Sequence, residues 1–192
     1  MLLGEKNRGF TLVELTISMV IGLIIIILVT TSFGLAQKTF RKSNIRAELT
    51  QNGRVTLDLM SRELRQAKTI VTALPENDSN PETMAHEIQF EDGHITSQIQ
   101  YIRYYLAGNS LYRQTIAYCF ETDCPNYVHW NDVDAFGPPD LQILDADPAG
   151  KIIGENFSGL NFYGLDSITI DLNLQKSGEE VGIRAVINPR NI

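Results

Sequence analysis

The run MVIGLIIIILV at residues 19–29 decides the architecture of this chain. It lies inside a longer stretch, residues 15–37, in which none of the 23 side chains is charged. A helix needs about 20 mostly apolar residues to cross the hydrocarbon core of a bilayer. No segment after residue 40 has this character, so the sequence predicts one membrane-spanning helix near the N-terminus with a polar body behind it.

Composition places the rest of the chain among folded proteins. The chain has 192 residues, of which 43% are hydrophobic and 20% are charged. This content suits one globular domain with an appendage and is too apolar for a disordered chain. The formal net charge is -7. Nucleic acid is therefore not expected as a partner of the isolated head, because phosphate binding needs clustered lysine and arginine.

A retained membrane anchor is favoured over a cleaved secretory signal. The apolar core of a signal peptide has about 7–15 residues and ends at a small-x-small cleavage site. The uncharged stretch here is longer, and residues 30–36, TTSFGLA, make a poor site of that kind.

One carboxylate, Glu14, stands at the start of the apolar run, within the sequence RGFTLVEL at residues 8–15. An ionised acid at the centre of a bilayer costs about 2.5–3.5 kcal/mol on insertion scales and less near an interface. Two interpretations stay open from the residues alone. Either Glu14 lies at headgroup level without a function, or it has a dedicated cationic partner.

The sequence RGFTLVEL resembles the processing site of type IV pilins and of the pseudopilins of type II secretion. The resemblance implies that a membrane peptidase cleaves after Gly9 and N-methylates the new first residue, Phe10. It also implies that Glu14 neutralises the Phe10 amine of an adjacent subunit as subunits enter a filament. Opposite charges in an apolar seam can specify one register, because removing either leaves the other unpaired.

The distribution of basic residues does not by itself predict this orientation. Two basic residues, Lys6 and Arg8, precede the apolar stretch. Four follow it closely: Lys38, Arg41, Lys42 and Arg46. Basic residues usually mark the cytoplasmic side. The resemblance implies the opposite arrangement, with a leader read in the cytoplasm and the head outside the inner membrane.

The helix is expected to continue beyond the membrane as an amphipathic segment. Apolar residues recur at helical spacing, with Gly53 interrupting, and charged residues lie between them. Pro75 and the polar run that follows it end the pattern. The predicted organisation is a leader at 1–9, a transmembrane or filament-core helix at 10–37, its amphipathic continuation at 38–74, and a β-rich head at 75–192.

The head is expected to be an antiparallel β-sheet. Two hairpins stand out, one with its turn at residues 107–110 and one with its turn at 176–179. The expected strands are Glu87–Phe90, Gln98–Leu106, Leu111–Tyr118, Ile168–Leu174 and Val181–Ile187. Residues 125–151 are predicted to be mostly loop. The fold class is therefore α+β, with a long, half-transmembrane helix packed against an antiparallel sheet, as in pilins.

Three looser stretches resemble the larger minor members of the family, the J-type pseudopilins and the W-type minor pilins. They are the helix segment from Gly53 to Ala67, the first hairpin from Ile99 to Gln114, and the end of the chain from Val186 to Asn191. A major pilin usually has a shorter β-domain, so the resemblance favours a minor subunit.

The two cysteines, Cys119 and Cys124, enclose four residues. A disulfide between them is expected in an oxidising compartment, with two free buried thiols as the alternative. A loop this small gives a stabilisation of about 2 kcal/mol by chain entropy. A metal site would need more soft ligands, and His129 is the only one nearby.

No catalytic residue, metal site or cofactor is predicted. His86, His94 and His129 are scattered and match no hydrolase motif. The segment DADPAG at residues 145–150 opens like a calcium loop, but Ala149 occupies the fifth position and Asn156 the twelfth. A turn is therefore favoured over a calcium site there.

The leading hypothesis is a minor pilin or pseudopilin without enzymatic activity, built into the tip or priming complex of a filament. Its expected partners are the prepilin peptidase, other minor and major subunits, the inner-membrane assembly platform and the lipid bilayer. The first alternative is a tip module that binds DNA, a surface or a secretion substrate. The second is an uncleaved, signal-anchored extracytoplasmic domain, which predicts an intact N-terminus.

Overall fold

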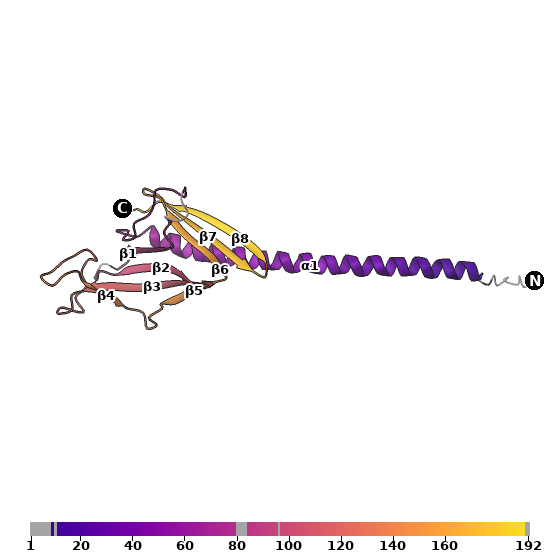
Figure 1. Ribbon diagram of the computed structural model, residues 1–192, viewed down its shortest axis with the longest axis horizontal. Coiled ribbons are helices and arrows are strands. Elements are labelled where there is room, and N and C mark those ends of the chain that lie inside the picture. The colour runs from indigo at the N-terminus through magenta and orange to yellow at the C-terminus, as the bar shows by residue number, and fades with distance from the viewer. Residues whose placement is uncertain (1–8, 10, 80–83, 96, 191–192) are drawn as a thin grey trace, which may run out of the picture. The chain divides into compact units, whose positions relative to one another are not determined.

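A computed structural model describes residues 9, 11–79, 84–95 and 97–190 (Figure 1). It contains one long helix, α1 (Leu12–Leu64), and eight strands. The strands are β1 (Glu87–Glu91), β2 (Tyr101–Ala107), β3 (Ser110–Cys119), β4 (Asp140–Ile143), β5 (Lys151–Glu155), β6 (Phe157–Tyr163), β7 (Ile168–Lys176) and β8 (Glu179–Ile187). The chain divides into two compact units, Met1–Asn44 and Ile45–Ile192.

The first unit carries the N-terminal part of α1. Its middle is rich in isoleucine, which is a modest helix former in water. In lipid a helix is favoured whatever the propensity, because all its backbone hydrogen bonds are internal. Every described residue from Thr11 to Asn44 is exposed except Gly22, which is half-buried. By length and composition α1 can cross a membrane, and it is the one such helix in the described part of the chain.

The first sheet of the second unit has the strand order β1-β2-β3-β4, and β5 pairs with β3 beside β4. All its pairings are antiparallel. The hairpin between β2 and β3 closes with Ala107 opposite Ser110. Gly108 in its turn has a φ of 60°, a conformation that glycine adopts without steric cost. The first predicted hairpin is confirmed.

The second sheet has the order β6-β7-β8 and is also antiparallel. Its hairpin closes with Lys176 opposite Glu179. Ser177 and Gly178 lie between them with φ values of 51° and 80°, as a two-residue hairpin turn of the primed type requires. The buried apolar residues of β7 alternate with more polar ones, as the sequence predicts.

The C-terminal part of α1 packs against both sheets within the second unit. Leu49, Leu57, Met60 and Leu64 belong to one core cluster with apolar side chains of β1, β2, β6, β7 and β8. Gly53 is buried and does not interrupt the helix. A Cβ atom there would lie 2.4 Å from Cδ1 of Ile183 on β8, so the glycine permits close packing. The α+β fold is confirmed.

The helix is shorter than predicted. We expected it to continue to about Leu74, and α1 ends at Leu64. Residues 69–72, Thr-Ile-Val-Thr, are all β-branched, and the backbone of this run pairs with β1 instead of continuing the helix. Val71 N donates to Gln89 O at 2.8 Å, and Glu91 N donates to Thr69 O at 2.8 Å.

The region from residue 125 to 151, predicted as mostly loop, contains β4 and the first residue of β5. The four residues of β4 are all exposed, so no alternation of buried and exposed side chains marks it. Its strand conformation comes from pairing with β3, where Ile116 lies opposite Ile143. Strand β6 was also not predicted.

Candidate functional site

The predicted cleavage position, Gly9, is exposed. A Cβ atom there would meet no heavy atom of the described residues within 4 Å, so packing among these residues does not require glycine at position 9. The predicted leader residues 1–8 and Phe10 lie outside the described residues.

The first turn of α1 is closed by a capping box. The Thr11 backbone N–H and its hydroxyl both donate to Glu14 Oε2, each at 3.0 Å. In return, Glu14 N donates to Thr11 Oγ1 at 3.2 Å. This reciprocal pattern satisfies backbone donors that an open helix start would leave unpaired. It was not predicted, although the Thr-x-x-Glu spacing in the sequence is its recognised signal.

The capping box orients the Glu14 carboxylate toward the N-terminal side of the helix, where residue 10 precedes Thr11. Both bonds to the carboxylate go to Oε2. The other oxygen, Oε1, has no hydrogen bond to any residue that the structure describes. It can therefore accept a donor from a second molecule while the box stays closed. No other carboxylate occurs between Gly9 and Ala47.

The helix that follows is suited to an apolar environment. Two of its hydroxyl groups are satisfied within the helix: Thr30 donates to Ile26 O at 3.0 Å, and Thr31 donates to Ile27 O at 2.9 Å. Backbone carbonyls are the usual partners of such hydroxyls where water is absent. The large side chains along residues 12–35 are more than half exposed, so this surface needs lipid or neighbouring helices to cover it.

The head contains a polar network between α1 and the first sheet. The Tyr104 hydroxyl donates to Glu63 Oε2, and Arg113 Nε lies 3.1 Å from both Glu63 oxygens. Burial, and then the Glu63 carboxylate, raise the pKa of Tyr104 above its ordinary value. The three residues come from α1, β2 and β3, so no local sequence signal predicts their meeting.

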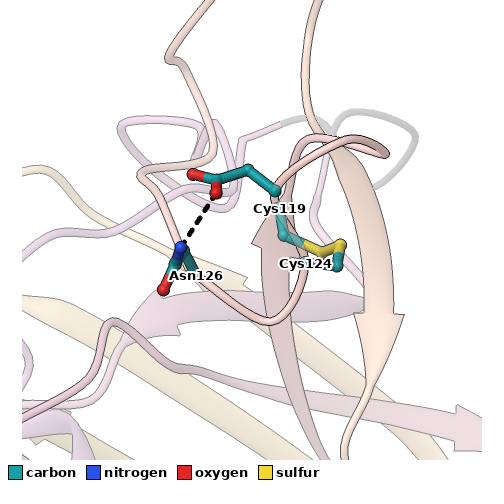
Figure 2. The surroundings of a disulfide bond; sticks show 4 residues. Cys119, Cys124 and Asn126 are labelled. Carbon is teal, nitrogen blue, oxygen red and sulfur yellow. Dashed lines mark hydrogen bonds between the residues drawn. A yellow bond between two sulfur atoms is a disulfide. The ribbon is translucent and has the colours of Figure 1, made fainter.

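The two cysteines are joined by a disulfide at the end of β3 (Figure 2). The turn that it closes is held by Cys124 N donating to Phe120 O at 3.1 Å and by Asn126 Nδ2 donating to Asp123 Oδ1 at 2.9 Å. Four residues beyond Cys124, Val128 N donates to Tyr118 O at 2.8 Å. These contacts tie the beginning of the long loop before β4 to the sheet.

The carboxylates considered for calcium form hydrogen bonds within the chain. Asp145 Oδ2 accepts from Thr115 N at 2.6 Å, and Asp147 Oδ1 accepts from Ala149 N at 2.9 Å. Each therefore stabilises local backbone. Among the residues that the structure describes, no group of three or more His, Cys, Asp or Glu side chains is arranged to hold a metal ion.

The three histidines lie apart, each beside a different partner. His86 Nδ1 is 3.2 Å from Leu160 O. His94 Nδ1 is 3.0 Å from Asp92 Oδ1, and His129 Nδ1 is 3.6 Å from Glu91 Oε2. The structure does not bring these three histidines together into one site.

Residues 5–30 match the family model described as the prokaryotic N-terminal methylation motif. The match covers the predicted cleavage position Gly9, the capping box and most of the apolar part of α1, and the head lies outside it. No curated protein matches the chain. The motif supports a pilin- or pseudopilin-type subunit, and the apolar N-terminal helix fits a single-pass membrane anchor.

Proposed function

We propose that this protein is a minor pilin or pseudopilin, a structural subunit of a type IV pilus or of a type II secretion pseudopilus. One observation carries the proposal: the methylation motif at residues 5–30 leads directly into the exposed apolar part of α1, and the only carboxylate between Gly9 and Ala47, Glu14, lies in its first turn. In this role the chain has no catalytic activity. It works by packing its helix and head against other subunits.

In the proposed pathway the chain is held in the inner membrane before assembly, with its N-terminus in the cytoplasm. The prepilin peptidase cleaves after Gly9 and methylates the Phe10 amine. The assembly platform then transfers the subunit from the bilayer into the filament. The exposed apolar surface of α1 exchanges lipid for neighbouring helices during this transfer.

Glu14 has two successive partners in this account. Before assembly its Oε2 is held by Thr11, which satisfies part of the carboxylate in the apolar surroundings. During assembly Oε1 accepts the Phe10 amine of an adjacent subunit. The pairing fixes the axial register, because any other register leaves one charge unpaired in a low-dielectric seam.

The size of the head supports a minor subunit in the tip or priming complex. In the described residues, eight strands in two sheets follow α1. The stretches Gly53–Ala67, Ile99–Gln114 and Val186–Asn191 resemble J-type pseudopilins and W-type minor pilins. The partners in such a complex are other minor and major subunits.

A second candidate function is a tip module that binds a target. It is favoured by two large apolar side chains on the loop before β4, Val133 and Phe136, which are 72% and 90% exposed. Cleavage removes Glu5, Lys6 and Arg8, which leaves 14 basic and 22 acidic residues and a net charge of -8. An apolar protein surface is therefore a better target than DNA.

The test of the proposed function is the variant Glu14→Gln. The amide oxygen of glutamine still accepts from Thr11, so the capping box is kept while the charge is lost. We expect normal membrane insertion and cleavage, with incorporation into filaments reduced by more than about tenfold, because one partner of a buried ion pair is missing. The measurement is the fraction of the chain recovered in sheared filaments.

The matched control is Thr16→Ala, which removes a hydroxyl in the next turn that donates to Val13 O at 2.9 Å and leaves the charge in place. It should incorporate normally. Normal incorporation of Glu14→Gln would contradict the charge-pair mechanism.

A further inference from the structure

Basic side chains gather immediately after the uncharged part of α1. Lys38, Arg41 and Lys42 are all exposed, and their spacing of three and four residues brings them to one side of the helix. The sequence has no carboxylate between Leu15 and Ala47. The proposed processing and charge pairing at the N-terminus use none of these residues.

Their position along the helix matches the headgroup layer of a bilayer. The 23 uncharged residues from 15 to 37 span about 34 Å at about 1.5 Å per residue, close to a hydrocarbon core of about 30 Å. The next turn, residues 38–42, rises by about 6 Å. A bilayer is about 40–45 Å thick with its headgroups, so each polar layer is also roughly 5–7 Å deep.

Charges further along the helix are already matched by the head. Arg46 Nε lies 3.0 Å from Glu179 Oε2, and Glu48 pairs with Lys176. Lys38 and Arg41 form no ion pair with any residue in the described ranges. These two cations are therefore available to a ligand outside the chain.

The surface beside Arg41 is also suited to a lipid. Arg41 lines a shallow groove together with Ala36, Gln37 and Phe40. Phe40 is 67% exposed and follows the apolar stretch by three residues. A groove with an apolar floor and a guanidinium at its polar end can hold the upper part of an acyl chain with its phosphate near the arginine.

We propose that Lys38 and Arg41, with Lys42 beside them, bind the phosphate groups of anionic phospholipids in the leaflet next to the head. The proposal rests on the proposed function only in requiring that α1 spans a membrane. Binding of these lipids would fix the depth of α1 in the bilayer before the subunit is assembled. These lipids must be released when the subunit leaves the bilayer. A lipid is favoured over the acidic head of another subunit because the cations directly adjoin the apolar stretch.

The experiment places the full chain in nanodiscs of equal phosphatidylglycerol and phosphatidylcholine and measures the lipids that remain bound by native mass spectrometry. Wild type should retain phosphatidylglycerol preferentially. Each basic residue near an anionic surface contributes roughly fivefold. Lys38→Gln/Arg41→Gln should therefore reduce the preference by roughly 25-fold, and Lys38→Arg/Arg41→Lys should keep it.

The matched control is Arg54→Gln/Arg62→Gln, which removes two exposed charges of the same helix within the head. It should leave the preference unchanged. Equal losses in both double variants, or equal retention of the two lipids by wild type, would overturn the proposal. So would inorganic phosphate adducts in place of lipid.

The assay needs insertion of α1 but neither cleavage nor a filament. A chain that inserts, shows the lipid preference and is never cleaved would contradict the proposed function and leave the lipid site standing. A chain that inserts and is cleaved normally but shows no lipid preference would overturn the lipid site alone.

Discussion

At the scale of single residues, the capping box shows how an acid is accommodated at the start of an apolar helix. The motif is usually discussed as a means of starting a helix. Here the same contacts also occupy one carboxylate oxygen of Glu14 and orient the other. The residue that the resemblance assigns to assembly is therefore held in position by its own helix before a partner arrives.

The polar network in the head makes a prediction about stability. Glu63→Ala removes the carboxylate that Arg113 and Tyr104 share and leaves the partly buried Arg113 guanidinium without its ion-pair partner. We expect the free energy of unfolding to fall by about 3 kcal/mol. The measurement is denaturant unfolding of the full chain in detergent micelles, followed by the fluorescence of Trp130.

The control is Glu48→Ala on the same helix. Glu48 pairs with Lys176 at the surface, and exposed pairs of this kind contribute about 0–1 kcal/mol. An equal decrease in the free energy of unfolding in the two variants would show that the Glu63 network contributes no more to stability than a surface ion pair.

At the scale of elements, the close contact between α1 and β8 depends on the missing side chain at Gly53. Alanine is the better helix former by about 1 kcal/mol. Its Cβ would lie 2.4 Å from Ile183 Cδ1, however, so that methyl must move. We predict that Gly53→Ala is destabilising by about 1–3 kcal/mol because the contact is overpacked.

Ile183→Val removes the clashing methyl and provides the test. Thermal unfolding should show that Gly53→Ala/Ile183→Val is more stable than the sum of the two single changes predicts. Additive effects, or a gain in stability from Gly53→Ala alone, would contradict the packing role assigned to this glycine.

The sequence predicts those elements whose pattern of apolar and polar residues lies entirely within their own segment. The apolar helix follows from its uninterrupted length, and the hairpin of β7 and β8 follows from alternation on both sides of a glycine-containing turn. The end of α1 at Leu64 and the exposed strand β4 are set by pairing with strands distant in the chain. Local propensity carries no information about such pairing, so these features could not be predicted.

The features of the candidate site also fall into local ones, which the sequence can predict, and ones assembled by the fold, which it cannot. The processing motif and the Thr11–Glu14 spacing are local, and the second was available in the sequence. The Glu63 network is assembled from three elements and becomes visible only in the fold.

At the scale of the whole molecule, charge is segregated along the sequence. Residues 45–192 contain 11 basic and 21 acidic residues, a net charge of -10. Residues 10–44 of the processed chain contain three basic residues and one acidic residue. The protein thus combines an acidic head with a basic segment next to the proposed membrane span, which favours attachment to an anionic bilayer through the helix.

The head should lose stability at high pH. Burial raises the pKa of Tyr101 to about 12, whereas a tyrosine in an unfolded chain has a pKa of about 10. Between these values the unfolded chain releases a proton that the folded chain keeps. The stabilisation is therefore complete below about pH 10 and declines as pH rises toward 12.

Thermal unfolding measured across this range should show the decline, and Tyr101→Phe should make it shallower. Part of the decline should remain in this variant, because burial also raises the pKa of Tyr104. An identical pH dependence in wild type and Tyr101→Phe would contradict this assignment.

The central claim is that the chain is processed as a pilin-type precursor. The most direct measurement is the intact mass of the native protein isolated from membranes, with Gly9→Leu as the matched variant. The account predicts a wild-type mass that lacks residues 1–9 and carries one added methyl group, and a full-length mass for the variant. A full-length, unmethylated wild-type protein would contradict it and would identify the chain as an ordinary membrane-anchored domain.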